Sequence, residues 1–437
     1  MQKKVPMYII KNILLCLACL ALHTAQAQDV PTPAPAQPEP ILIVNATIHI
    51  GDGTTIEKGV LGFDKGKIVL LQATDSLNTS NYEFKNIIDA TNQHIYPSLI
   101  ACNTILGLNE IDAARPTRDY YETGDYNPNA RSLIAYNTDS RITPTVRTNG
   151  ILLAQIVPQG NIITGSSSVV QLDAWNWQDA AYKADEGIWL NFPSSFSYDW
   201  EAKATKPNKN FEAEITELNH YFDQARTYQE TDQSASYNSR FAAMKGLFDR
   251  SQTLYINANN AKEIMAAVLF AQTQNLKLCL VGATECYKTI EILQKNKVSV
   301  MLNGTHSLPQ TDDSDIKQPY KTPKILQDAG INYTITINDS WKIRNLPFEA
   351  GTAAAYGVTK EQALQAITLN AAKILGIDAQ TGSLKVGKDA NFFVSKGDAL
   401  DMQTNQITQA YIQGRAISLR NKQTELYEKF KAKYEKN

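Results

Sequence analysis

The chain has 437 residues, of which 43% are hydrophobic and 20% charged, and its formal net charge at pH 7 is −2. This nearly balanced charge argues against a nucleic-acid partner, which would call for a basic surface. Five cysteines in such a length do not suit a disulfide scaffold, so we expect one large core and a smaller second domain.

The N-terminal segment has the pattern of a secretory signal peptide. Lysines precede an apolar stretch over residues 13–22, and a small-residue cleavage pattern ends at Ala27. The apolar stretch is too short for a membrane span, which needs roughly 20 apolar residues. We therefore expect residues 1–27 to be removed, leaving a periplasmic chain without a transmembrane anchor. Lipid attachment at Cys19 is the alternative.

Both ends of the mature chain have simple patterns. Residues 28–40 alternate proline with small or polar residues, which predicts an extended linker. Over residues 41–96 short apolar runs are separated by glycine-containing turns, as in antiparallel strands. The same pattern returns over residues 380–422. We expect these two segments to form one small β-sandwich, followed by a helical tail over residues 423–437.

Between these ends the chain alternates strand-like and helix-like segments. The alternation predicts an α/β fold, and residues 97–379 are long enough for a parallel, TIM-like (β/α)8 barrel. Thr359 followed by Gln362 predicts a capping box at a helix start. The polar stretch 201–249 is expected to be a helical insertion over the barrel mouth, and residues 160–177 a connection between strands. The strand candidates are residues 151–158, 253–258, 276–283, 298–304 and 332–338.

Three stretches resemble the amidohydrolase superfamily, most closely its imidazolonepropionase-like branch. Residues 89–100 are similar to the family motif D-A-x-G-x-x-V-x-P-G-L-I, and residues 344–377 look like its last barrel strand-loop and closing helix. Residues 382–394 match the returning strand motif G-S-I-x-x-G-K-D-A-D-L-V-V. The resemblance spans residues 41–419. It implies a barrel with a composite β-sandwich, and a metal-dependent hydrolase of carbon–nitrogen bonds other than peptide bonds.

The first barrel strand departs from the family pattern P-G-L-I-D-x-H-x-H. In the run YPSLIACNTILGL (residues 96–108) the two histidine positions fall on Asn103 and Ile105. Because residues i and i+2 of a strand share a face, the histidine pair would hold a metal from one side. A carboxamide and a butyl group cannot replace two imidazoles as zinc ligands. The resemblance therefore implies a site that has lost its metal-binding pair.

The other family ligands match equally poorly. By the same resemblance, the strand-five histidine falls on Asn257, and the strand-six histidine falls near Val281 or Gly282. The strand-eight aspartate, which in the family takes a proton from the metal-bound water, has one candidate, Asp339. We expect no bound metal cofactor. The alternative is a hard cation held by oxygens of Asn103, Asn257 and Asp339.

Four further residues have competing interpretations. His306 follows a strand end, where barrel active sites are built, and could orient a ligand or satisfy loop hydrogen bonds. Arg344 could bind a substrate carboxylate or form an internal ion pair. If Asn103 points into the barrel, Cys102 should point towards the helices as a small buried side chain. Cys286 is expected to be a structural or free thiol.

Two functional hypotheses follow. In the first, the chain is an exported, non-catalytic or catalytically impaired homologue that binds a small amide ligand or associates with an active amidohydrolase paralogue. In the second, it hydrolyses amides, cyclic amides or dipeptides, with Asp339 as base and Asn103 or Asn257 polarising the carbonyl. A metal lowers the pKa of bound water from about 15.7 to about 7, and nothing in the sequence replaces that effect. The sequence therefore favours the first hypothesis.

Overall fold

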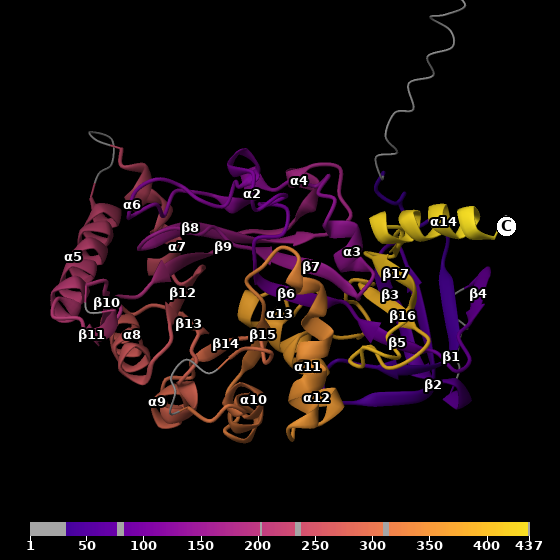
Figure 1. Cartoon of the computed structure of the whole chain (residues 1–437). Coiled ribbons are helices and arrows are strands. Elements are labelled where there is room, and N and C mark those ends of the chain that lie inside the picture. The colour runs from indigo at the N-terminus through magenta and orange to yellow at the C-terminus, as the bar shows by residue number, and fades with distance from the viewer. Residues whose placement is uncertain (1–31, 77–82, 202, 232–236, 309–313, 436–437) are drawn as a thin grey trace, which may run out of the picture. The chain divides into compact units, whose positions relative to one another are not determined.

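The computed structural model describes residues 32–76, 83–201, 203–231, 237–308 and 314–435. From Pro33 onward the described chain groups into one compact unit, which consists of a barrel and a separate sheet (Figure 1). The expected signal peptide, including Cys19, and the first residues of the linker lie outside the described residues. Within the described ranges, no helix is both long enough and apolar enough to cross a membrane.

A mixed sheet combines strands from both ends of the chain, as the sequence predicts. Its strands are β1 (Ile41–His49), β2 (Thr55–Asp64), β3 (Lys67–Ala73), β4 (Asn86–Asp89), β5 (His94–Pro97), β16 (Phe392–Ser395), β17 (Ile407–Ile412) and β18 (Arg415–Ala416). Their order is β18-β17-β16-β5-β1-β2-β3, with β4 also paired to β1. The Phe63 ring of β2 lies 5.2 Å from that of Phe392 and 5.0 Å from that of Tyr411, measured between centroids. These aromatic contacts join the two chain ends in one core.

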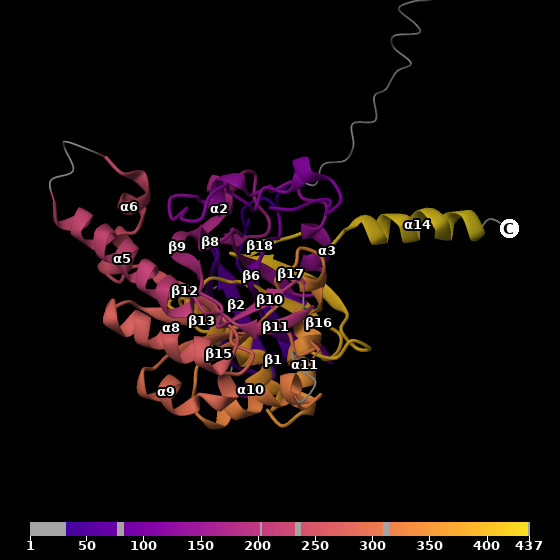
Figure 2. The same ribbon diagram turned by 60° about the vertical axis from the view of Figure 1, so that its left-hand side comes forward.

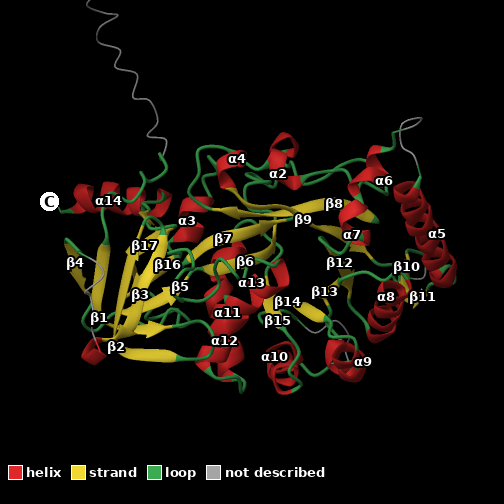
Figure 3. Ribbon diagram, turned by 180° about the vertical axis from the view of Figure 1, so that it is seen from behind, coloured by secondary structure: helices red, strands yellow, loops and turns green. Residues whose placement is uncertain are grey.

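The remaining long strands form a nearly closed barrel, which confirms the predicted fold. They are β6 (Leu99–Thr104), β7 (Ile151–Ile156), β8 (Ile163–Gln171), β9 (Ala181–Asn191), β12 (Thr253–Ala258), β13 (Leu278–Gly282), β14 (Ser299–Asn303) and β15 (Tyr333–Thr336). Each strand pairs with the next in this series, and β15 packs beside β6. Figure 3 shows the barrel on the right and the mixed sheet on the left. All five strand candidates of the sequence are barrel strands.

Strand β8 departs from the expected all-parallel arrangement. It runs antiparallel to both β7 and β9. The connections on its two sides, residues 157–162 and 172–180, are shorter than the dozen or so residues that a parallel crossover requires. The interpretation of residues 160–177 as a mere connection is therefore wrong, because residues 163–171 form a buried barrel strand.

Helices cover the outer face of the barrel. They include α8 (Ala261–Thr273), α9 (Ile290–Lys295), α10 (Gln318–Asp328), α11 (Leu346–Ala355) and α12 (Lys360–Ala366). Helix α13 (Leu369–Leu375) instead packs on the buried cluster inside the barrel. The predicted capping box of Thr359 and Gln362 is present at the start of α12. Helix α13 ends at Gly376, whose φ of 66° is left-handed. Figure 2 shows α8, α9 and α10 along one flank of the barrel.

The rest of the described chain forms shorter helices and one hairpin. The hairpin strands are β10 (Phe196–Asp199) and β11 (Ala204–Pro207). The α-helices are α2 (Ser132–Ala135), α3 (Thr143–Arg147), α4 (Trp177–Ala180), α5 (Phe211–Glu230), α6 (Ser239–Ala243), α7 (Lys245–Phe248) and α14 (Lys422–Tyr434). The 3-10 turns are η1 (Thr74–Ser76), η2 (Arg115–Thr117), η3 (Cys286–Lys288) and η4 (Lys342–Asn345).

Helix α5 packs on the outside of the barrel rather than over its mouth. It buries Phe211, Leu218, Phe222 and Ala225, which lie on one face at helical spacing. The Phe222 ring meets Phe270 of α8 edge-on, with 5.1 Å between the ring centroids. This apolar stripe attaches α5 to α8, so only the β11 part of the insertion lies beside the mouth, where Thr205 lines a neighbouring cavity.

Candidate functional site

The carboxyl ends of the barrel strands surround a cavity of about 300 Å³. This is the end of a β/α barrel at which active sites are built. The cavity wall carries carboxamide side chains from six barrel strands or the loops after them, and none of the described residues that line it is ionisable. The carboxamides belong to Asn103, Gln159, Asn191, Asn257, Asn303 and Asn338.

The backbone of Asn103 decides which side chains of the first strand face the cavity. Its φ is 52°, and the pairing of β6 with β7 shifts register between Ala101 and Thr104. At this bulge Asn103 lines the cavity, and Cys102 belongs to a buried cluster with members on most of the barrel strands. The expected outward position of Cys102 is therefore wrong, because the alternation of side chains breaks at the bulge.

Ile105 lies in a different layer from Asn103. It follows the last residue of β6 and is 8% exposed. Its side chain belongs to the core layer between the outer faces of the strands and the helices, and it does not line the cavity. The two positions that align with the family's first pair of metal ligands therefore do not face a common point.

A buried carboxyl group lies beneath the mouth. Glu186 of β9 accepts hydrogen bonds of 2.7 Å from Gln155 Nε2 and the Tyr255 hydroxyl, and a third from the Ser167 hydroxyl. Burial raises the pKa of the Glu186 carboxyl, although these donors act in the opposite direction. Gln155 in turn accepts a 3.1 Å hydrogen bond from the backbone N–H of Asn103. Sequence reasoning missed Glu186, whose one visible signal is an acidic residue directly before the apolar run GIWL.

Asn257, at the aligned strand-five position, joins a chain of carboxamides along the cavity wall. Asn259 Nδ2 donates to Asn257 Oδ1 at 3.4 Å, and Asn257 Nδ2 donates to Asn191 Oδ1 at 3.3 Å. Asn191 Nδ2 then donates to the carbonyl of Gly160 at 3.0 Å. Each carboxamide both donates and accepts here, so the wall is polar without carrying charge.

Asp339 is turned away from the cavity by its own loop. Its Oδ1 accepts hydrogen bonds of 2.6 Å from the backbone N–H groups of Trp341 and Lys342, at the start of η4. The preceding residue, Asn338, lines the cavity instead and accepts a 2.8 Å hydrogen bond from Gln159 Nε2. The role of Asp339 as a base stays a prediction, and its carboxylate holds a turn in this structure.

His306 and Arg344 make local contacts outside the cavity wall. His306 Nδ1 lies 3.3 Å from Glu349 Oε1, and its Nε2 lies 2.6 Å from Thr352 Oγ1. Arg344 donates to the carbonyl of Trp341 at 2.6 Å, and its guanidinium lies 4.5 Å from the centroid of the Trp341 ring. The contacts of His306 match its loop-stabilising interpretation. Those of Arg344 lie within its own turn and correspond neither to the expected ion pair nor to the expected carboxylate site, so the role of Arg344 stays a prediction.

A scan against protein-family models matches residues 240–417 to the model described as the amidohydrolase family. The matched range contains β12 to β15, the closing helices and the returning strands of the mixed sheet. This match and the barrel fold together point to one family. The chain belongs to the amidohydrolase superfamily.

Two curated relatives add to this superfamily assignment. The chain is 35% identical over 78 residues to an imidazolonepropionase of Shewanella frigidimarina, a match covering 18% of each protein. It is 28% identical over 134 residues to the amidohydrolase tasK of Hapsidospora irregularis, covering 28% of this chain and 14% of the relative. The chain thus spans under a fifth of the length of these relatives, and it is a distant homologue of the imidazolonepropionase.

Solved structures of other amidohydrolases share the fold. An amidohydrolase from Thermotoga maritima superposes with a TM-score of 0.73 at 20% identity, covering 87% of this chain and all of that one. Molinate hydrolase superposes with a TM-score of 0.54 at 14% identity, covering 88% of this chain and 95% of that one. These likenesses concern the architecture of the barrel and the mixed sheet.

The donor groups of this superfamily member do not fit a catalytic zinc site. Zinc in proteins is held by imidazole, thiolate and carboxylate groups, with three protein ligands at a catalytic site. Among the described residues, no three such groups converge so that they could hold a metal ion. The cavity offers carboxamide oxygens, which match a hard cation better but supply no negative charge.

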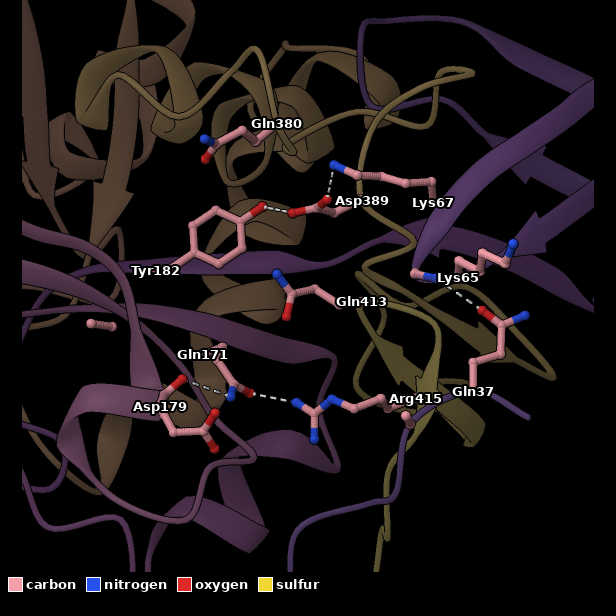
Figure 4. A pocket seen from close by; sticks show the side chains of 13 residues that line it. Gln37, Lys65, Lys67, Gln171, Asp179, Tyr182, Gln380, Asp389, Gln413 and Arg415 are labelled. Carbon is pink, nitrogen blue, oxygen red and sulfur yellow. Dashed lines mark hydrogen bonds and ion pairs between the residues drawn. The ribbon is translucent and has the colours of Figure 1, made fainter. Parts of the chain in front are cut away.

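A second cavity, of about 680 Å³, lies at the opposite end of the amidohydrolase barrel, where it meets the mixed sheet (Figure 4). Asp389 pairs there with Lys67 and accepts a hydrogen bond from the Tyr182 hydroxyl. Arg415 donates to Gln171 Oε1 at 2.9 Å. Because Asp389 and Arg415 each have a partner on a barrel strand, and Lys67 is paired with Asp389, we assign this cavity a structural role.

Proposed function

We propose that this chain is a non-catalytic member of the amidohydrolase superfamily that binds a small amide-like ligand at its barrel mouth. The observation that carries the proposal is the cavity wall, which has carboxamides at aligned ligand positions, Asn103 and Asn257. Without a metal, water that attacks an amide lacks the fall in pKa from about 15.7 to about 7. This loss favours binding over hydrolysis.

The positions of the nearby carboxylates also support the proposal. A general base must come within roughly 2.6–3.2 Å of the proton-bearing atom that it serves. The Asp339 carboxylate is engaged by two backbone amides, and the Glu186 carboxyl is enclosed by three donors below the cavity. Both groups therefore hold the fold together in this arrangement.

The test measures metal content and turnover on one preparation of the purified protein. We expect zinc well below one equivalent by elemental analysis, and no hydrolysis of N-acyl amino acids, dipeptides or lactams, with or without added zinc. Near-stoichiometric zinc together with turnover that Asp339→Ala abolishes would contradict the proposal and favour a working hydrolase. Asp328→Ala, on the exposed face of α10, is the matched control.

We also propose that the chain is exported, on the signal-peptide pattern of residues 1–27. Fractionation of cells that make the tagged chain should recover it from the periplasm with a new N-terminus at Gln28. Retention in the membrane fraction through Cys19 would instead support lipid attachment. A full-length cytoplasmic chain would contradict export.

A further inference from the structure

The mouth cavity, here called the inner cavity, adjoins a larger cavity, here called the outer cavity. Asn303, the last residue of β14, lines both. The outer cavity has a volume of about 750 Å³ and lies between the ends of β13 and β14, the β10–β11 hairpin and helix α10. Phe196, Tyr287 and Pro319 supply apolar wall. Both volumes lie in or close to the range of roughly 300–1,000 Å³ that small-molecule sites occupy.

The charged side chains around the outer cavity already have partners. Lys288 Nζ lies 2.6 Å from Glu285 Oε1, and Asp315 pairs with Lys321. Lys262 Nζ lies 4.4 Å above the ring centroid of the first residue of α5. A charged ligand would therefore have to displace an existing partner to be neutralised here.

The inner cavity has polar groups with unused hydrogen-bonding capacity. Asn103 Oδ1 and Trp189 Nε1 are enclosed without a partner, in residues that are 3% and 6% exposed. Asn303 is an exposed residue, and its carboxamide also makes no hydrogen bond within the described ranges. Buried polar groups in native proteins are as a rule paired, so Asn103 Oδ1 and Trp189 Nε1 indicate a binding partner that carries both a donor and an acceptor.

We propose that the two cavities together bind one uncharged ligand, with a carboxamide-like head group in the inner cavity and an aromatic or apolar group in the outer one. The inference rests on the proposed function, since it assigns a ligand class to the same mouth. The selection against charge follows from desolvation, because an ion that enters a site without a free counter-ion loses its hydration uncompensated.

Three related probes test the expected preference for an uncharged ligand by calorimetry at pH 6, where the amine and the carboxyl group of the two charged probes are both ionised. N-acetyl-phenylalaninamide is neutral, N-acetyl-phenylalanine carries a carboxylate, and phenylalaninamide carries an ammonium group. We expect the neutral probe to bind at least tenfold more tightly than either charged probe. Asn303→Ala should weaken the neutral probe roughly tenfold, the effect of one lost hydrogen bond. Gln403→Ala, an exposed carboxamide away from both cavities, should leave affinity unchanged.

Equal affinity for the charged probes, an unaltered affinity in Asn303→Ala, or no binding of the neutral probe at millimolar concentration would each overturn the inference. These outcomes are distinct from failure of the proposed function, which is read from zinc and turnover in the same samples. A neutral probe that binds and is also hydrolysed would overturn the non-catalytic assignment and keep the ligand class. If calorimetry detects no binding of the neutral probe and no turnover occurs, the ligand class alone would be overturned.

Discussion

Asn103 and Ile105 are two positions apart in the chain, yet Asn103 lines the mouth cavity while Ile105 packs in the core outside the strands. The left-handed φ of 52° at Asn103 causes the separation, since it breaks the alternation of side chains at the end of β6. Asparagine adopts this conformation more readily than most residues. The two positions aligned with the family's histidine pair therefore present their side chains to different layers of the fold.

Placing histidines at both positions should therefore fail to create a zinc site. In the double variant Asn103→His, Ile105→His, the second imidazole enters an apolar layer instead of the mouth. We expect the Ile105→His change to lower the free energy of unfolding by roughly 1–3 kcal/mol, the cost of an unpaired buried polar group. Zinc analysis and urea unfolding of both single variants and the double variant measure these effects. One tightly bound zinc in the double variant alone would show that the backbone can realign.

Much of the fold could be predicted from local patterns. The apolar runs that form β12, β13 and β14 are separated by helical segments, and few folds other than a parallel α/β fold are compatible with that alternation. Strand β8 was missed because its glycine- and serine-rich sequence resembles a connection. Its identity as a strand comes from pairing with β7 and β9, which is tertiary information.

For the site, the sequence predicted only that the aligned ligand positions lack imidazoles. Asn103 stands at one of these positions, but the cavity also contains the carboxamides of Asn303 and Gln159, which belong to no motif. For a similar reason, the sequence did not predict that Glu186 is buried beneath the cavity. An acidic residue in a strand is expected to face water, and only the fold brings three hydrogen-bond donors around it.

Glu186→Gln should remove part of the pH dependence of stability. Burial raises the pKa of the folded-state carboxyl above the ordinary value of 4.5, so the folded chain keeps this proton after the unfolded chain has lost it. The wild-type free energy of unfolding should therefore fall as pH rises above 4.5, until the folded-state pKa is passed. The glutamine variant has no such proton and should show a flatter profile.

Urea unfolding at several values between pH 4.5 and pH 8 measures this difference for Glu186→Gln. Glu291→Gln, on the exposed side of α9, should follow the wild-type profile. Parallel profiles for wild type and Glu186→Gln would mean that the Glu186 carboxyl is ionised in the folded protein throughout this range.

Asp173 should be a main point of attachment between the barrel and the mixed sheet. Its carboxylate lies 2.6 Å from Arg147 and 2.9 Å from Arg415 of β18, and it accepts a 2.8 Å hydrogen bond from the backbone of Ala34. Asp173→Asn leaves two guanidinium groups without their counter-charge, and Arg147 is almost fully buried. We expect a loss of about 3 kcal/mol in unfolding free energy.

Chemical unfolding of Asp173→Asn measures that loss. The control is Glu428→Gln on α14, which removes an exposed ion pair with Arg420 and should have a much smaller effect. Equal effects of the two substitutions would be evidence that the Asp173 cluster contributes no more than a surface pair.

The three described cysteines should be unreactive in the folded protein. Cys102, Cys279 and Cys286 are at most 1% exposed, and burial raises the pKa of each thiol, that of Cys286 to about 12. Because the thiolate is the nucleophile, iodoacetamide at pH 8 should leave all three unmodified, whereas the same reagent in denaturant should modify all three. Peptide mass spectrometry assigns each site. Rapid labelling of Cys286 in the native protein would imply that η3, next to the outer cavity, opens on the time scale of the reaction, and that the cavity is wider in solution.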